Sequence, residues 1–270
     1  MTEKISIEKL SGVPRTLLIP LCGRSLAAKK YPQYDFHDPL AEETIQKLNF
    51  NSAEFSFDSM SMKGSIVRAK AIDSLAQDFF IKNPHGLGIS LGTGLCTRFW
   101  RIDNSDLSWL DVDFPEVIEL REKLLPKNPR HYSFPCSLLS NLWIKKAQEI
   151  NKKPWFISIE GVLMYLKPSE VESFFKLVAE LAPAGSELVF DYTNPLLIKL
   201  NIKPLAVLRS GTTFHWGISK LSEVEKLSPR FKCVNSPISF PISKLHALGH
   251  RIISTLLGGE VYALGHFKIN

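Results

Sequence analysis

Long hydrophobic runs and paired cysteines are both missing from this sequence. No apolar run approaches the roughly 20 residues that a membrane-spanning helix needs. The first ten residues mix acids and lysines with isolated apolar residues, which is unlike a secretory signal. The four cysteines are widely scattered and form no C-x-x-C pair: Cys22, Cys96, Cys136 and Cys233. We therefore expect reduced thiols, a cytoplasmic protein and no membrane partner.

Several patterns that carry chemistry are also missing. The sequence has no G-x-S-x-G elbow and no cysteine close to a histidine, so covalent nucleophilic catalysis has no support. His246 and His250 stand four residues apart on an expected helix, but no glutamate follows His246 and no third ligand is near. We expect a surface pair rather than a metal site. The net charge of +6 comes with dispersed lysines and no basic stripe among aromatics, which argues against nucleic acid as a partner.

What the sequence does contain is a glycine turn behind a short apolar run. Residues 87–91 predict a buried strand, Gly92-Thr93-Gly94 a turn, and the residues that follow can start a helix. Gly92 permits a tight turn, and Gly94 leaves no side chain where a ligand must approach the backbone. The third glycine of the dinucleotide fingerprint is replaced by Thr97. Alone, this pattern is also explained by a tight turn without a ligand.

An acidic residue behind the next strand strengthens the case for a ligand. The apolar run 109–112 ends at Asp113, which lies 21 residues after Gly92. At this spacing an acid reaches the ribose hydroxyls in Rossmann-type sites. The alternative is that Asp113 only caps the following helix. Asp111 lies on the same face of that strand, so the choice between the two aspartates stays open.

The segment ahead of the glycine turn, residues 1–84, is predicted to be a helical cap or lid. Asp38 followed by Pro39 is typical of a helix start. A polar loop is expected over residues 49–61, and a helix over residues 66–80. Such a segment is long enough to cover the C-terminal edge of a sheet, where ligands sit in open α/β folds.

Strands and helices are expected to alternate from residue 87 onward. Strands are predicted at 87–91, 108–112, 131–136, 155–160 and 187–192, and helices at 95–101, 115–125, 138–150 and 168–182. Repeated βα units of this length predict an α/β fold with a parallel, doubly wound sheet. Residues 85–270 are expected to form one structural unit with the cap, with an insertion at about 193–220.

The C-terminal part continues this pattern less regularly. A short helix is expected at Ser222, with a capping box formed with Glu225. A strand around 233–240, a helix over 242–257 and a closing strand over 261–269 complete the prediction.

Six stretches beside the glycine turn carry a family resemblance: GVPRTLLIPLCGRS, HDPLAEE, KGSIVRAKAID, LDVDFPEVIELREKLLP, ISIEGVLMYL and FHWGI. With them the chain resembles the leucine carboxyl methyltransferase family, and within it a bacterial branch of small-molecule O-methyltransferases associated with polyketide biosynthesis. The resemblance implies a Rossmann-like class I methyltransferase fold, with a mostly parallel seven-stranded sheet, helices on both faces and an N-terminal helical cap. It also implies S-adenosylmethionine as the cofactor and a small-molecule methyl acceptor.

The resemblance implies a role for particular residues. Arg68, expected in the first turn of its helix, matches the arginine that meets the cofactor carboxylate, and Arg24 matches a second basic position. Glu160 matches an acid near the methionine amine or the reacting centre. The whole implied cofactor site is Arg24, Arg68, Gly92, Thr93, Gly94, Asp113, Ser137, Leu138 and Glu160. For the two arginines a surface ion pair is the alternative.

Two departures from the family pattern concern this cofactor site. Many members have Leu-Asp-Thr-Arg after the glycine turn, where this chain has Leu95-Cys96-Thr97-Arg98. Many have Asp-Leu beside the adenine, where this chain has Ser137-Leu138. Ser137 can still form one hydrogen bond to the adenine amino group, but it brings no charge. Lower cofactor affinity, or a degenerate binding protein without activity, follows as an alternative.

The acceptor pocket is predicted at Tyr165 and at Phe214-His215-Trp216. No catalytic residue is assigned, because methyl transfer rests mainly on alignment and exclusion of water. A general base is useful only for a phenol or alcohol, and for His215 a backbone-satisfied, partly buried histidine is the alternative. The acceptor group, carboxylate or hydroxyl, stays open. Other hypotheses are an NAD-dependent oxidoreductase on the same kind of sheet and a protein carboxyl methyltransferase.

Overall fold

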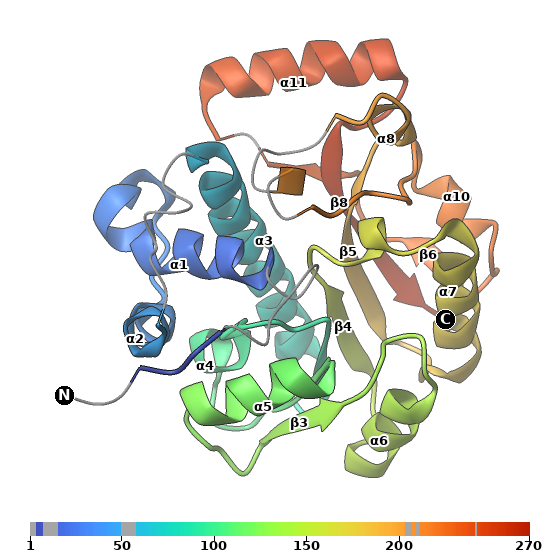
Figure 1. Cartoon of the computed structure of the whole chain (residues 1–270). Coiled ribbons are helices and arrows are strands. Elements are labelled where there is room, and N and C mark those ends of the chain that lie inside the picture. The colour runs from blue at the N-terminus through green and yellow to red at the C-terminus, as the bar shows by residue number, and fades with distance from the viewer. Residues whose placement is uncertain (1–3, 8–15, 50–57, 203–206, 209–210, 241) are drawn as a thin grey trace.

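Strand β1, Leu87–Leu91, lies inside an eight-stranded sheet that runs through the middle of the molecule (Figure 1). The computed structural model describes residues 4–7, 16–49, 58–202, 207–208, 211–240 and 242–270. The strand order is β3-β2-β1-β4-β5-β8-β6, and β7 pairs with β8. The remaining strands are β2 Ser108–Asp113, β3 His131–Pro135, β4 Trp155–Ile159, β5 Glu187–Thr193, β6 Phe231–Cys233, β7 Ile238–Ser239 and β8 Tyr262–Ile269.

Strands β1 to β5 are parallel, and β8 runs antiparallel to β5. All five residues of β1 and of β4 are buried. Helices therefore cover both faces of these strands, as in parallel sheets generally. The helices that follow the first four strands are α4 Arg98–Ile102, α5 Pro115–Leu124, α6 Leu142–Ile150 and α7 Pro168–Leu181.

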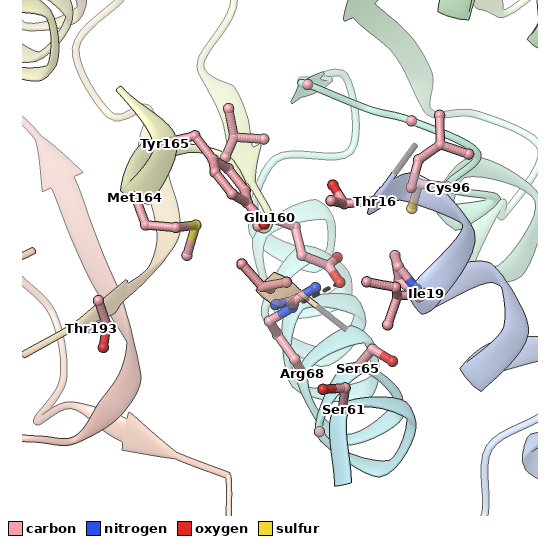
Figure 2. A pocket seen from close by; sticks show the side chains of 18 of the residues that line it. Thr16, Ile19, Ser61, Ser65, Arg68, Cys96, Glu160, Met164, Tyr165 and Thr193 are labelled. Carbon is pink, nitrogen blue, oxygen red and sulfur yellow. Dashed lines mark hydrogen bonds and ion pairs between the residues drawn. The ribbon is translucent and has the colours of Figure 1, made fainter. Parts of the chain in front are cut away.

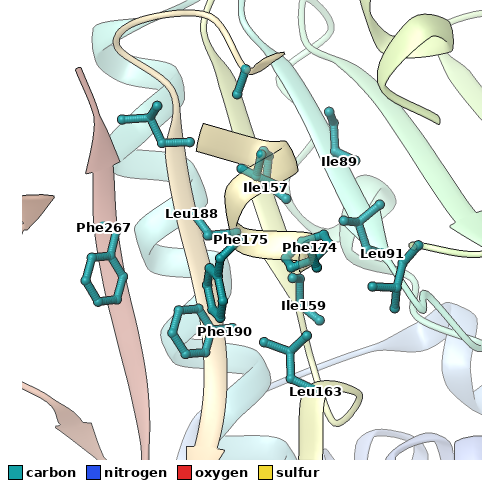
Figure 3. Close-up of a cluster of buried hydrophobic side chains, with 14 of the residues drawn as sticks. Ile89, Leu91, Ile157, Ile159, Leu163, Phe174, Phe175, Leu188, Phe190 and Phe267 are labelled. Atoms are coloured by element: carbon teal, nitrogen blue, oxygen red, sulfur yellow. The ribbon is translucent and has the colours of Figure 1, made fainter. Parts of the chain in front are cut away.

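The larger hydrophobic core lies between the sheet and the helices α6 and α7. Phe174 and Phe175 of α7 pack against Ile157 and Ile159 of β4 (Figure 3). Phe190 of β5 joins the same cluster and stacks on Phe267 of β8, with 5.7 Å between ring centroids. On the opposite face a second cluster joins α4 and the long helix α3, Ser59–Lys82, to the sheet.

The N-terminal segment is helical, as expected. It contains α1 Leu18–Lys30, the short 3-10 helix η2 Pro32–Tyr34, α2 Pro39–Lys47 and α3. Asp38 caps α2, since its carboxylate accepts a hydrogen bond from the Ala41 N–H at 3.0 Å. Figure 1 shows these helices gathered beside the sheet, with α3 running along it.

Four expectations from the sequence differ from the structure. The sheet has eight strands rather than seven, because the expected strand at 233–240 divides into β6 and β7. Helix α3 begins at Ser59, capped by Asp58, and not at Ile66. Residues 59–61 therefore belong to the helix and Arg68 lies beyond its second turn, while residues 50–57 of the expected loop fall outside the described residues.

The fourth difference is the expected capping box at Ser222. Leu221 holds the cap position of α10, Ser222–Glu225, without a side-chain hydrogen bond. Glu223 serves the helix start instead, since its carboxylate accepts from the backbone N–H groups of Ser219 and Lys220 at 2.9 Å. A carboxylate near a helix N-terminus is stabilised by the helix dipole. Glu223 can therefore take the role that the sequence predicted for Glu225.

The remaining elements lie near the predicted positions. Within 193–220 the structure describes α8, Pro195–Lys199, while residues 203–206 and 209–210 fall outside the described residues. Helix α11, Lys244–Leu257, ends at Gly258, which has the left-handed φ of 64°. No helix in the described part of the chain is long and apolar enough to cross a membrane.

Candidate functional site

A cavity of about 1120 Å³ opens at the carboxyl ends of the parallel strands. Its walls include the loops after β1 to β5, the start of α1, and residues of α3 and of α11. Typical small-molecule pockets measure roughly 300–1,000 Å³. The cavity is slightly larger than this range.

The glycine turn after β1 forms one wall of this cavity. Gly92 and Gly94 have φ values of 67° and 52°, a region that favours glycine. A Cβ atom at Gly92 would lie 2.4 Å from the Val162 side chain, so the turn tolerates no side chain there. The Gly94 N–H donates to Asp113 Oδ2 at 2.7 Å, which ties the turn to the end of β2.

The structure separates the two aspartates of β2. Asp111 is buried below the turn, where it pairs with Arg121 and accepts a hydrogen bond from the Thr93 hydroxyl at 2.9 Å. Burial alone would raise its pKa, but Arg121 and His131 lower the pKa of Asp111 to about 2. Asp113 lines the cavity, and burial raises its pKa. Of the two, only Asp113 is placed to meet a ligand.

Arg68 and Glu160 face each other across the cavity floor (Figure 2). Arg68 Nε donates to Glu160 Oε1 at 2.9 Å, and its Nη1 donates to Asp191 Oδ2 at 2.9 Å and contacts the Tyr262 hydroxyl. Arg98 Nη2 donates to the other oxygen, Glu160 Oε2, at 2.7 Å. Burial alone would raise the pKa of Glu160, but the two guanidinium charges outweigh it and hold the pKa far below its usual range.

This ion network continues from the cavity into the N-terminal helices. Arg98 and Arg101 of α4 both donate to Asp73 of α3 at 2.7 Å. Arg101 also reaches Asp38 at 2.9 Å, and Asp38 pairs with Arg24 of α1 at 3.0 Å. Across the cavity floor and this extension, four arginines meet four carboxylates, so the charges cancel.

Arg24 is therefore a buried network residue as well as a cavity residue. It is 3% exposed, and its Nη2 donates to the Leu95 carbonyl, just after the glycine turn, at 2.7 Å. Thr97, in the place of the third fingerprint glycine, donates its hydroxyl to Asp38 at 2.5 Å. This departure from the fingerprint thus anchors α4 to the cap.

The two departures from the family pattern both lie on the cavity wall. Cys96, Ser137 and Leu138 line it, and the Ser137 hydroxyl accepts a hydrogen bond from the Leu139 N–H at 3.2 Å. The hydroxyl keeps a proton to donate, so Ser137 can still pair with a ligand acceptor.

Only two of the four residues predicted for an acceptor pocket line the cavity. Tyr165 and Phe214 do, in an edge-to-face contact with 5.2 Å between ring centroids. His215 is exposed, and its N–H donates to the Met164 carbonyl at 2.7 Å. Trp216 is buried in the hydrophobic core. The three neighbouring side chains thus point in three directions: Phe214 into the cavity, His215 to solvent and Trp216 into the core.

His246 and His250 also depart from expectation. Both line the cavity instead of forming a surface pair. The described residues contain no cluster of three histidine, cysteine or acidic side chains that could hold a metal ion.

Comparison with known proteins identifies the family. The family model described as leucine carboxyl methyltransferase matches residues 22–179, which is more than half of the chain. The chain belongs to the leucine carboxyl methyltransferase family. This match spans most of the cap, the glycine turn, both aspartates of β2 and Glu160.

A curated relative and two solved structures are similar to this chain. The tetracenomycin polyketide synthesis O-methyltransferase TcmP of Streptomyces glaucescens is 27% identical over 258 residues, covering 92% of this chain and 94% of TcmP. A duf574 family protein from Streptomyces avermitilis has a TM-score of 0.59 at 13% identity, covering 94% of this chain and 97% of that one.

A third relative is the magnesium protoporphyrin IX methyltransferase ChlM of Synechocystis, whose structure has SAH bound. It has a TM-score of 0.51 at 12% identity, covering 92% of this chain and 98% of that one. At these identities, the two structures show a shared fold.

As a member of this family, the chain is a methyltransferase dependent on S-adenosylmethionine. The family thereby removes the hypothesis of an NAD-dependent oxidoreductase. The implied Rossmann-like methyltransferase fold is confirmed.

Sequence reasoning missed three residues of the cavity floor in this leucine carboxyl methyltransferase family member. Asp191 lies near the end of β5, as Glu160 follows β4, so an acid near the end of a buried strand was a usable signal. Arg98 and Tyr262 gave no such signal in the sequence, because their hydrogen-bond partners lie far away in the chain.

Proposed function

We propose that this enzyme transfers a methyl group from S-adenosylmethionine to an oxygen atom, carboxylate or hydroxyl, of a small molecule. The observation that carries the proposal is the cavity at the carboxyl ends of β1, β2, β4 and β5, with a glycine turn, an acid and a neutral ion network in its walls. The relative TcmP, named for polyketide synthesis, supports a small-molecule acceptor.

The walls fit the methionine end of the cofactor. Arg68 Nε and Nη1 are engaged, while Nη2 donates to none of the described residues, which leaves it for a carboxylate. Glu160 lies beside it for an ammonium group. Because the network is already neutral, the ammonium and carboxylate groups of the cofactor, whose charges cancel each other, add no net charge to it. An isolated anion or cation would unbalance these buried charges.

The walls also fit the nucleoside end. Asp113 is placed for the ribose hydroxyls, because its carboxylate is fixed by the N–H groups of Gly94 and Phe114 at 2.7 and 2.8 Å. Ser137 and Leu138 lie on the same wall, where we place the adenine. The absence of a Cβ at Gly94 leaves backbone accessible between the two ends of the cofactor.

The residues act mainly by positioning. The cofactor, when bound, supplies a methyl group on a sulfonium that is already activated for displacement. Arg68, Glu160 and Asp113 fix the direction of that methyl group, and Tyr165 with Phe214 holds the acceptor opposite it. Holding two reactants in line supplies a large part of the rate in such reactions.

We predict that Asp113→Ala weakens the binding of S-adenosylhomocysteine by about 1–3 kcal/mol, the usual contribution of hydrogen bonds to a charged group. Isothermal titration calorimetry of the folded variant measures this. Asp106→Ala, which changes an exposed acid in the loop before β2, is the matched control. Unchanged affinity in Asp113→Ala would show that the ribose binds at another wall of the cavity.

We also propose that the N-terminal segment acts as a lid over the cofactor. Ile19 and Arg24 of α1 and Ser61 and Ser65 of α3 line the cavity, so a bound cofactor would contact both helices. Closing this side keeps water from an alkylating group. We expect S-adenosylhomocysteine to increase hydrogen-exchange protection within residues 12–70. Protection confined to residues 87–165 would show a fixed cap instead.

A further inference from the structure

Two segments that line the cavity account for the whole net charge of the chain. Residues 194–222 and 234–259 contain six lysines and arginines and no aspartate or glutamate. This equals the net charge of +6, so the rest of the chain is neutral. Lys199, Lys220 and Arg251 have described side chains, and all three are exposed. The other basic residues of the two segments are Lys203, Arg209 and Lys244.

The two segments lie side by side in the structure. A Cβ atom at Gly217 would lie 3.0 Å from the Ile198 side chain of α8, which places residue 217 against that helix. A Cβ atom at Gly259 would lie 2.3 Å from the Ser219 carbonyl oxygen, so the end of α11 meets the same segment. Figure 1 shows α11 along the outer edge of the molecule with α8 close to it. The exposed charges of these elements therefore gather at one end of the molecule.

Helix α11 carries an apolar stripe on its outer side. Leu248, Ile252 and Leu256 stand four residues apart and are 57%, 54% and 81% exposed. With about 3.6 residues per turn, this stripe faces away from His250, which lines the cavity. None of the side chains at residues 246–257 is buried, whereas a helix of a globular protein normally buries its apolar side. The stripe therefore has no apolar partner among the described residues.

Helix α8 and the residues that follow it extend this apolar stripe. Leu196, Leu200 and Ile202 are also exposed. In the described parts of the two segments, no phenylalanine, tyrosine or tryptophan is exposed, so the exposed apolar residues are aliphatic. We call the whole set the basic apolar surface: Leu196, Lys199, Leu200, Ile202, Lys220, Leu248, Arg251, Ile252 and Leu256.

We propose that the basic apolar surface binds peripherally to an anionic lipid bilayer, with α11 lying in the membrane–water interface. Interfacial helices combine an exposed apolar side with lysines and arginines that attract anionic lipids. The expectation of no membrane partner rested on the absence of a membrane-spanning run, and an interfacial helix needs none. The same segments line the cavity, so the bound bilayer lies next to it.

A bilayer explains this surface better than a protein does. A symmetric dimer would place the same patch of each copy against the other, which brings like charges together where the segments contain no acid. The core of a protein–protein interface is enriched in aromatic residues and depleted in lysine, and the exposed residues here show the opposite composition. Lipid headgroups supply the negative charge, and acyl chains accept aliphatic side chains without a shaped pocket.

Co-sedimentation of the full chain with lipid vesicles tests the proposal. Vesicles of phosphatidylcholine with about a quarter of phosphatidylserine present an anionic surface, and vesicles of phosphatidylcholine alone do not. We expect binding to the anionic vesicles at low salt and at least about tenfold weaker binding to the neutral ones. Binding should be lost at about 1 M salt, where charges are screened beyond about 3 Å.

Ile252→Ser and Leu256→Ser test the apolar stripe. Each is expected to weaken binding to the anionic vesicles about tenfold, because an aliphatic side chain that enters the interface leaves water. Ile81→Ser is the matched control. Ile81 is 78% exposed at the end of α3, outside the basic apolar surface, and its variant should bind as wild type does. All three side chains are exposed, and thermal unfolding checks that the variants keep the fold.

Arg251→Gln tests the charge. We expect about fivefold weaker binding to the anionic vesicles and no change with neutral ones, the usual effect of one basic residue near an anionic membrane. Lys152→Gln is the control, because Lys152 is equally exposed but lies before β4, at the other end of the parallel strands. It should bind both kinds of vesicle as wild type does.

Three results would overturn the proposal. Absence of binding to either kind of vesicle removes the lipid surface, and a dimer that Leu256→Ser dissociates in analytical ultracentrifugation would then assign the stripe to a second copy. Equal binding to both kinds of vesicle removes the role of charge. Binding that salt abolishes but that Ile252→Ser and Leu256→Ser leave unchanged is purely electrostatic, as expected for an acidic protein partner. None of these results bears on the methyltransferase proposal, which calorimetry with S-adenosylhomocysteine tests separately.

Discussion

Glu160→Gln is expected to lower the free energy of unfolding by about 3–5 kcal/mol, the usual result of removing one partner from a buried charge cluster. Each Glu160 oxygen accepts a hydrogen bond from a different buried guanidinium, at 2.9 Å from Arg68 and 2.7 Å from Arg98. An amide keeps the size of the side chain but cancels its charge, so the two guanidinium groups lose their shared counterion. Urea unfolding of wild type and variant measures the difference.

Glu119→Gln is the matched control for this prediction. Glu119 also forms an ion pair, with Lys123 at 2.6 Å, but both side chains are more than half exposed. Exposed pairs of this kind contribute about 0.2–1 kcal/mol at most. If both variants lower the free energy of unfolding by the same amount, the ion network at the cavity floor does not stabilise the fold more than an exposed ion pair does.

The Glu160 carboxylate also makes the stability of the fold depend on pH. The pKa of Glu160 in the folded state lies far below the value of about 4.3 for an unfolded glutamate. A depressed pKa contributes stability that is present above the unfolded value and is lost as pH falls toward the folded one. Wild-type stability should therefore decline from about pH 5 downward, and Glu160→Gln should decline less steeply.

Arg68→Ala is expected to weaken S-adenosylhomocysteine binding about 100-fold, and Arg68→Lys about 10-fold. Hydrogen bonds to charged groups contribute about 1.5–3 kcal/mol each, and each tenfold change corresponds to about 1.4 kcal/mol. Lysine keeps the charge but loses the planar fork that fits a carboxylate. Calorimetry of the folded variants gives both values.

Arg101→Lys separates binding from stability in this series. Arg101 is as buried as Arg68 and pairs with Asp73 and Asp38, but it does not line the cavity. We expect lower stability with unchanged affinity. Equal losses of affinity in Arg101→Lys and Arg68→Lys would mean that Arg68 supports the fold and does not hold the cofactor carboxylate.

The strands of the parallel sheet were predictable because burial on both faces leaves a simple pattern. The run at residues 87–91 forms β1 as predicted, and the other four parallel strands lie within one residue of the predicted ends. Apolar runs suffice for this in β1 and β4, which are fully buried, whereas the edge strand β3 is only partly buried. Helix starts were less accurate, since the first turn of α3, Ser-Met-Ser-Met, alternates polar and apolar residues and shows no helical apolar stripe.

The residues of the candidate site also fall into two groups, those that the sequence predicts and those that it does not. The glycine turn and Asp113 depend on local spacing, so the sequence places them on one wall of the cavity, as the structure does. The pairing of Arg98 with Glu160 depends on tertiary packing, because 62 residues separate them.

The most direct test of this account is a crystal structure of the chain with S-adenosylhomocysteine. We predict the ribose hydroxyls within hydrogen-bond distance of Asp113, and the ligand carboxylate within hydrogen-bond distance of Arg68 Nη2. The sulfur atom should then point toward Tyr165 and Phe214. A ligand bound with its carboxylate away from Arg68 and its ribose away from Asp113 would contradict the account.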